Sequence, residues 1–135
     1  MCYIYLIMRT ILIIGAGRSA SSLIQYLLNK SEVEDLHLVI GDLSLASAQK
    51  KVNNHPHATA IALDIFDKKQ RNSAIQNANI VISMLPAHLH IEVAKDCIVY
   101  KKHLVTASYI SEAMQELDAL AKENNLVFMN EGKRK

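Results

Sequence analysis

The sequence has no tryptophan, only five tyrosines and two phenylalanines, and only two cysteines in 135 residues. So few aromatic rings give few platforms for stacking bases, and we expect no nucleic-acid partner. Cys2 and Cys97 cannot make a disulfide framework or a four-cysteine zinc site, and they fit a reducing, cytoplasmic compartment. The pairs His55-x-His57 and His88-x-His90 have no cysteine or carboxylate at ligand spacing, so we expect no metal site.

Excess charge of one sign and long apolar runs are also scarce. Fifteen basic residues oppose thirteen acidic ones, and three of the basic residues are Lys133, Arg134 and Lys135. Without that tail the balance is 12 against 13, a net charge of −1, so the chain has no basic face for nucleic acid. Arg9 interrupts the apolar N-terminal run well short of the ~20 residues of a membrane span. That run also lacks the features of a signal peptide, so we expect no membrane partner.

Apolar, strand-like runs alternate with helix-length segments along the whole chain. The runs open near Ile11, Leu36, Ala58, Ile80, Leu104 and Leu126. They are continuous, which is typical of strands buried on both faces, and parallel neighbours need a crossover helix. We therefore predict an α/β fold, a doubly wound parallel six-stranded sheet of the Rossmann type with five helices.

These elements use up the chain as one domain. We predict that residues 1–7 are an N-terminal extension and that Met8 is the functional start. Residues 8–131 are then the domain itself, and residues 132–135 are a basic tail. The run Gly15-Ala16-Gly17-Arg18-Ser19-Ala20, between the first strand and the first helix, indicates that this is a dinucleotide-binding Rossmann domain.

The sharpest motif is a GxGxxA run between the first strand and the first helix. Its candidate cofactor-binding residues are Gly15, Gly17, Arg18, Ser19 and Ala20. The first glycine permits a tight turn, the second lets a pyrophosphate approach the backbone, and the alanine lets the helix pack close to the strand. The N-terminus of the helix offers unpaired N–H groups to phosphates. The alternative is a tight strand–helix turn without a ligand.

Asp42 ends the second predicted strand. A carboxylate there can accept both ribose hydroxyls of an adenosine and would repel a 2′-phosphate. No Lys or Arg follows before Lys50, so the sequence favours NAD over NADP. The alternative is that Asp42 only starts a turn or caps the next helix.

Three more strand ends lie at the same predicted edge. Asp64 and Ile65 follow the third strand, where they border an adenine or form an ordinary turn. Ser83-Met84-Leu85-Pro86 follows the fourth strand and Thr106-Ala107-Ser108-Tyr109 the fifth. We expect both to line the nicotinamide half of the cofactor, with ordinary loop chemistry as the alternative. His90 is expected in the first helical turn after Pro86, where it can face the crevice.

Four blocks, at their mutual spacing, resemble the N-terminal cofactor domain of the saccharopine dehydrogenase family, including its saccharopine reductase-like members. They are Ile11–Ala20, Val81–His88, Leu104–Ile110 and Met129–Glu131. The resemblance spans Met8 to about Glu131. It implies a nicotinamide-dependent oxidoreductase acting on carbon–nitrogen bonds of amino-acid-derived substrates. It also implies substrate contacts for Ser108, Tyr109, Asn130 and Glu131, whereas no catalytic residue is assigned.

The chain departs from the family pattern in two places. Members with an arginine after the second strand look like NADP users, whereas this chain has Asp42. Family chains also continue past a Met-Asn-Glu block into a large substrate and dimerisation domain, whereas Gly132-Lys-Arg-Lys follows here. We therefore expect a truncated or excised cofactor domain that is inactive alone and forms homo-oligomers. The alternative class is a stand-alone nucleotide-sensing module like the regulators of potassium channels.

Overall fold

The computed structural model describes residues 9–17, 20–106 and 112–130. Six parallel strands form one sheet in the order β3-β2-β1-β4-β5-β6, which confirms the predicted doubly wound α/β fold. The strands are β1 (Arg9–Ile14), β2 (Leu36–Asp42), β3 (Ala58–Ala62), β4 (Ile80–Ser83), β5 (His103–Thr106) and β6 (Phe128–Asn130).

Five α-helices connect the strands. They are α1 (Ser21–Lys30), α2 (Leu45–Val52), α3 (Lys68–Gln76), α4 (His90–Tyr100) and α5 (Glu112–Glu123), with a short 3-10 helix η3 (Ala87–Leu89) before α4. Helices α2 and α3 begin at side-chain caps. The Ser44 hydroxyl accepts a hydrogen bond from the Ser47 N–H, and the Asp67 carboxylate accepts from Lys69 and Gln70.

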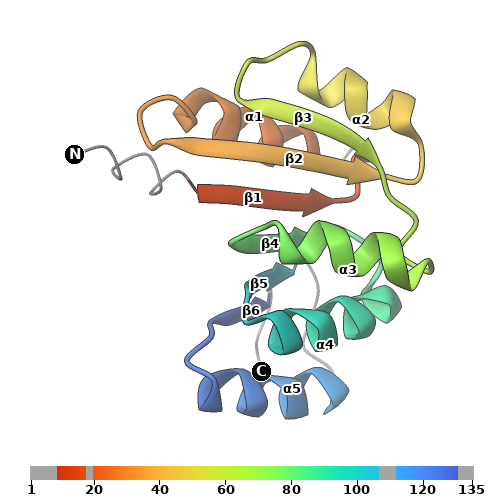
Figure 1. Ribbon diagram of the computed structural model, residues 1–135, viewed down its shortest axis with the longest axis vertical. Helices are drawn as coiled ribbons and strands as arrows, with labels where there is room; N and C mark the ends of the chain where they lie inside the picture. The colour runs from red at the N-terminus through yellow and green to blue at the C-terminus, as the bar shows by residue number, and fades with distance from the viewer. Residues whose placement is uncertain (1–8, 18–19, 107–111, 131–135) are drawn as a thin grey trace.

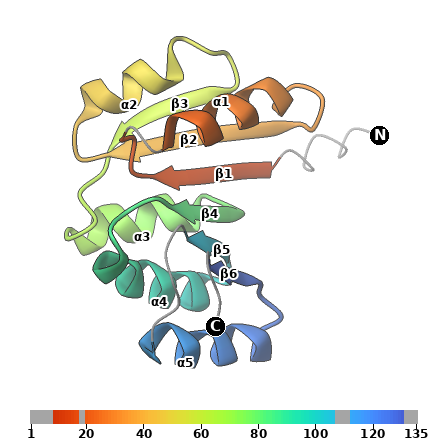
Figure 2. The ribbon, with the colours of Figure 1, turned by 180° about the vertical axis from the view of Figure 1, so that it is seen from behind.

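The helices cover the two faces of the sheet unequally. α1 and α2 pack on one face over β1 to β3, while α3, α4 and α5 lie on the other (Figures 1 and 2). Alternate residues of β1 enter the two cores, because successive side chains of a strand point to opposite faces. Ile11 and Ile13 pack toward α1 and α2, and Leu12 and Ile14 pack toward α3 to α5. Cys97 is fully buried in the second core, as predicted.

An apolar strip at one end of the sheet runs from the buried core to an exposed outer strand. Ile82, Val105 and Met129 are in register across β4, β5 and β6, on the face opposite Phe128. Met129 is 58% exposed and Val127 is 53% exposed, so no described helix covers this end on that face. Parallel sheets are normally covered on both faces, so this strip is a surface that another element can cover.

The carboxyl ends of the strands meet along one edge. Ile14 pairs with Gly41 on one side and with Ser83 on the other, and Ser83, Thr106 and Asn130 continue the same row. The residues that the sequence places after β1, β2, β4 and β5 therefore share one edge, where doubly wound sheets bind ligands. Within the described ranges, no helix combines the length and apolar character needed to cross a membrane.

The last strand begins two residues later than the sequence suggests. The Leu126 N–H donates to the Ala121 carbonyl at 2.8 Å, so Leu126 closes the end of α5 before β6 starts. Asn125 supports this ending with a φ of 61°, the left-handed conformation common after a helix.

Candidate functional site

The first glycine of the GxGxxA run is required by the backbone itself. Gly15 has a φ of 102°, a conformation that side chains disfavour. A Cβ there would also lie 3.4 Å from the Met84 backbone. The turn is fixed from both sides, because the Gly15 N–H donates to the Gly41 carbonyl and the Met84 N–H donates to the Ile14 carbonyl, each at 2.8 Å.

The second glycine has no such structural requirement. A Cβ added to Gly17 would meet no atom within 4 Å among the described residues, and its φ is not in the left-handed region. The described residues therefore leave open space in front of Gly17. Ala20 is fully buried, and its N–H donates to the Gly17 carbonyl at 3.1 Å. Arg18 and Ser19, which complete the motif, lie outside the described residues.

Asp42 lies beside this turn and holds it. One carboxylate oxygen accepts the Ala16 N–H and the other accepts the Ser44 N–H, both at 2.9 Å. The structure thus shows the turn-forming role that the sequence left as the alternative. The same bonds place the carboxylate at the edge of the sheet, directly beside the glycine turn.

A small cavity of about 140 Å³ opens at this edge. It brings together five of the predicted cofactor residues, namely Gly15, Asp42, Asp64, Ile65 and Leu85. It also contains Leu43, Phe66 and Leu89, which the sequence analysis missed. Leu43 and Phe66 are 76% and 77% exposed, so two large apolar side chains stand at its rim. The sequence does contain a signal for Leu43 and Phe66. Asp42 and Asp64 lie at or just after the ends of two successive strands, and a large apolar residue comes one or two positions after each.

Hydrogen bonds hold the loop after β3 that forms one wall of this cavity. The Phe66 N–H donates to the Asp64 carboxylate at 3.0 Å, and the Asp64 N–H donates to the Gln70 side-chain oxygen at 3.0 Å. This loop is therefore ordered by its own side chains before any ligand arrives.

At the end of β4, Ser83 is fully buried, and its hydroxyl lies 2.9 Å from Nδ1 of His90. His90 is 1% exposed, so it does not face the crevice as the sequence analysis allowed. Its Nε2 has no hydrogen-bond partner among the described residues. Burial, and then the nearby His88, lower the pKa of His90 below its ordinary value of 6.5. The pair joins β4 to α4 and fixes the intervening loop, in which Met84 and Leu85 are half-buried and Pro86 is exposed.

The structure describes only part of the remaining region that the sequence predicts to contact the nicotinamide. Thr106 is buried at the end of β5, in register with Ser83 and with Asn130 of β6. Ala107, Ser108, Tyr109 and Glu131 lie outside the described residues. The described part of the chain contains no cluster of three or more histidine, cysteine or acidic side chains that could hold a metal ion.

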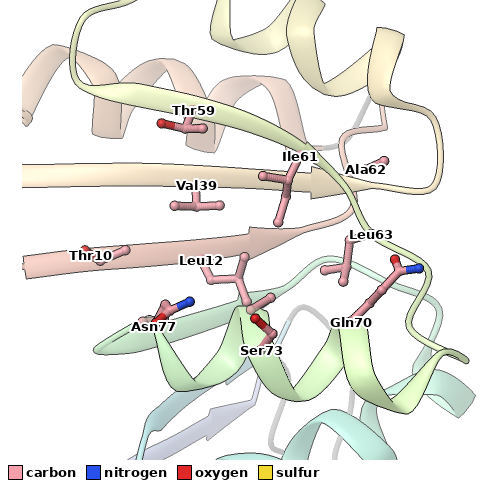
Figure 3. Close-up of a pocket in the computed structure, with 12 residues that line it drawn as sticks. Thr10, Leu12, Val39, Thr59, Ile61, Ala62, Leu63, Gln70, Ser73 and Asn77 are labelled. Atoms are coloured by element: carbon pink, nitrogen blue, oxygen red, sulfur yellow. The ribbon is translucent and has the colours of Figure 1, made fainter.

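A larger cavity, of about 400 Å³, lies away from the strand ends (Figure 3). It lies between α3 and the face of β1, β2 and β3, with Val39, Ile61 and Leu12 on the sheet side and Ser73 and Asn77 on the helix side (Figure 3). No residue of the glycine turn lines it. The strand-end cavity has the elements that bind ligands in this fold class, so we take it, and not the larger one, as the candidate site.

Comparison with known proteins decides the family. The profile described as "Saccharopine dehydrogenase NADP binding domain" matches residues 11–129. The chain belongs to this family. It is 32% identical over 123 residues to the saccharopine dehydrogenase [NADP(+), L-glutamate-forming] of Pyricularia oryzae, covering 91% of this chain and 26% of that protein. It is 30% identical over 138 residues to the alpha-aminoadipic semialdehyde synthase of Arabidopsis thaliana, covering 90% of this chain and 13% of that protein.

A solved structure gives the same result. The apo saccharopine dehydrogenase (L-Glu forming) of Saccharomyces cerevisiae matches with a TM-score of 0.82 and 30% identity, over 91% of this chain and 27% of that one. The chain thus spans about a quarter or less of the length of these relatives. Membership in an oxidoreductase family supports the first of the two classes that the sequence left open, and not the stand-alone sensing module.

The comparisons support a dinucleotide cofactor but not the expected preference for NAD. The family profile and the Pyricularia relative both carry NADP in their names. The expectation rested on Asp42 and on the absence of a Lys or Arg between it and Lys50. Both oxygens of that carboxylate already accept backbone N–H groups, so its role in the turn accounts for Asp42. The presence of Asp42 therefore does not by itself show whether the cofactor carries a 2′-hydroxyl or a 2′-phosphate.

Proposed function

We propose that this chain binds NADP(H) along the carboxyl edge of its sheet, with the pyrophosphate over Gly17. The observation that carries the proposal is the open space in front of Gly17, where the fold itself has no need of a glycine. Ala20 at the start of α1 makes no side-chain capping bond, so the first N–H groups of this helix have no side-chain acceptor from the cap position. A phosphate is the ligand class that such a helix start takes.

The adenosine end is proposed to occupy the 140 Å³ cavity. Adenine would lie between the exposed side chains of Leu43 and Phe66, over Ile65, and burying those side chains supplies apolar contact area. Asp42 would lie nearest the ribose. The residues that line this cavity include two carboxylates and no basic side chain. A 2′-phosphate therefore needs a cation from elsewhere, and we propose Arg18, which follows Gly17 directly in the sequence.

The nicotinamide end is proposed to lie over Ser83, Met84, Leu85 and Pro86 and beside Thr106, Ala107 and Ser108. Their support is the shared row of strand ends that continues from the glycine turn. For a longer protein containing this domain, we propose hydride transfer at a carbon–nitrogen bond of an amino-acid-derived substrate, as the names of the relatives suggest. Ser108, Tyr109, Asn130 and Glu131 remain the proposed substrate residues.

We propose that the isolated chain has no dehydrogenase activity. Hydride transfer requires a substrate held against the nicotinamide in a site that excludes water. A single sheet edge gives an open ledge rather than a closed site. The strip of Ile82, Val105 and Met129, which is exposed at Met129, supports a further proposal, that the chain forms homo-oligomers. The cytoplasmic location and the absence of nucleic-acid and membrane partners remain predictions.

Titration of the ¹⁵N-labelled chain with NADP(H), followed by NMR, tests the proposal. We expect amide shifts at Gly15, Gly17 and Phe66, and a parallel titration with NAD(H) gives the preference. Shifts confined to Thr59 and Asn77 would instead locate the ligand in the 400 Å³ cavity. No shift at millimolar cofactor would overturn the proposed function.

A further inference from the structure

A buried ion pair connects two helices to the wall of the candidate site. Nε of Arg71 in α3 lies 2.5 Å from a carboxylate oxygen of Asp96 in α4. A second guanidinium nitrogen, Nη1, donates to the Ile65 carbonyl at 2.7 Å. Arg71 is 7% exposed and Asp96 is 9% exposed, so all three groups meet away from solvent.

Stability alone does not explain this arrangement. Removing two charges from water opposes their mutual attraction, and apolar residues of similar volume often stabilise such a position equally well or better. What an arginine adds is geometry, because its rigid guanidinium presents donors in several fixed directions. Here the carboxylate of Asp96 orients the guanidinium, and the guanidinium then holds the Ile65 carbonyl.

The carbonyl that Arg71 holds belongs to the wall of the 140 Å³ cavity, which contains Ile65 and Phe66. The other hydrogen bonds of this loop act through Asp64, which accepts the Phe66 N–H and donates its own N–H to Gln70. They do not fix the peptide between Ile65 and Phe66 on its carbonyl side. Arg71 does, so it holds the stretch of backbone that carries Phe66 at the cavity rim.

We propose that Arg71 and Asp96 are a positioning pair for the adenosine half of the cofactor. The inference rests on the proposed function, in which adenine lies against Ile65 and Phe66. The pair does not touch the ligand. It acts through the backbone of the β3–α3 loop, and small displacements of a positioned group weaken binding strongly.

The test measures binding of the two halves of the cofactor separately. It also distinguishes an effect on the stability of the domain from an effect on the position of the loop. The double variant Arg71→Met with Asp96→Leu replaces the ion pair by apolar side chains. Arg71→Lys keeps the positive charge but loses the guanidinium, two of whose nitrogens contact Asp96 and Ile65 at once. Glu92→Gln is the matched control, because it breaks an exposed pair with Lys95, 3.6 Å apart, on the same helix α4. Affinities for AMP and for nicotinamide mononucleotide, urea midpoints and amide hydrogen exchange are measured for each.

We expect the double variant to keep its urea midpoint and to lose about tenfold in affinity for AMP, with affinity for nicotinamide mononucleotide unchanged. The Phe66 and Asp67 amides, which both bond to Asp64, should exchange faster, while Glu92→Gln should match the wild type. Should the double variant not fold, Arg71→Lys supplies the same comparison.

Two results would overturn the inference. One is wild-type AMP affinity in a folded variant that lacks the guanidinium, and the other is unchanged exchange at Phe66 and Asp67. If the wild-type chain binds neither nucleotide, the proposed function has failed, and the exchange measurement alone still decides whether the pair positions the loop.

Discussion

The Ala16 N–H donates to the Asp42 carboxylate at 2.9 Å and so ties the glycine turn to the end of the neighbouring strand. The other oxygen of the same carboxylate accepts the Ser44 N–H. One side chain therefore orders the glycine turn and the start of α2 together. Any change at this position acts both on the fold and on the charge beside the proposed 2′-phosphate.

Asp42→Asn removes the charge and keeps part of the structural role. Its one side-chain oxygen can still accept the Ala16 N–H, whereas its NH2 group cannot accept the Ser44 N–H. Because the negative charge is gone, we expect the affinity for NADP(H) to rise about tenfold relative to that for NAD(H). Asp42→Ala should lose the hydrogen bonds as well and destabilise the domain by about 1–2 kcal/mol. Calorimetric titration and urea unfolding measure the two effects. An unchanged affinity ratio in the asparagine variant would show that this carboxylate does not face the 2′ position.

The two glycines of the turn should respond differently to substitution. Gly17→Val places a side chain in space that no described residue fills, so the domain should fold normally and lose NADP(H) binding. Gly15→Ala forces a side chain into a φ of 102°, and it should destabilise the domain by about 1–3 kcal/mol. Circular dichroism melts and cofactor titrations compare the two variants. Unchanged affinity in the valine variant would mean that this glycine serves only the turn.

His90 should make the stability of the domain depend on pH. Its pKa in the folded protein lies below the ordinary 6.5, first because of burial and then because of His88. The unfolded chain then binds more protons in the window below about pH 6.5, so stability falls as the pH drops through that window. Urea unfolding between pH 5 and 8 should show this slope. His90→Asn, which keeps a polar atom near Ser83, should flatten it, and a variant with the full wild-type slope would contradict this assignment.

Cys97 should be chemically inert in the folded protein. Burial, and then the neighbouring Asp96, raise the pKa of its thiol to about 12, and the side chain is fully buried. The thiolate is the reactive form, so a thiol reagent should label it only at the rate of unfolding. A Cys2→Ser background leaves it as the only thiol in the sequence. Fast stoichiometric labelling in buffer at pH 8 would show that the helix α4 side of the core opens locally.

The sequence predicts the sheet well because its signals are local. The uninterrupted run Ile11–Ile14 marks a strand buried on both faces, and the two β1 side-chain rows do enter two different cores. Ser44 and Asp67 mark helix starts, because their side chains cap the first turn. Strand ends and glycine turns then bring the expected residues to one edge.

The contacts that shape the candidate site are not local, and no sequence pattern carries them. Arg71 and Asp96 are 25 positions apart and on different helices, so their pairing depends on how α3 packs against α4. The hydrogen bond between Ser83 and His90 depends on how the loop through η3 folds back onto β4. A motif predicts which residues lie at the carboxyl edge of the sheet. Tertiary packing decides which side chains are buried behind that edge and hold its loops by hydrogen bonds.

The isolated chain should self-associate weakly through its exposed strip. Met129 of β6, which pairs with Val105 of β5, and Val127 just before β6 are both exposed. A stable interface buries about 1,200 Å² or more, whereas Val127 and Met129 are two large apolar side chains, 53% and 58% exposed. We therefore expect association only at high concentration. Light scattering across concentrations should show the mass rising, and Met129→Glu should return it to that of a monomer. Tyr26→Ser removes an equally exposed side chain on α1 and should leave the mass curve unchanged. A strict monomer at the highest concentration would show that this strip, although apolar, does not pair with a second copy.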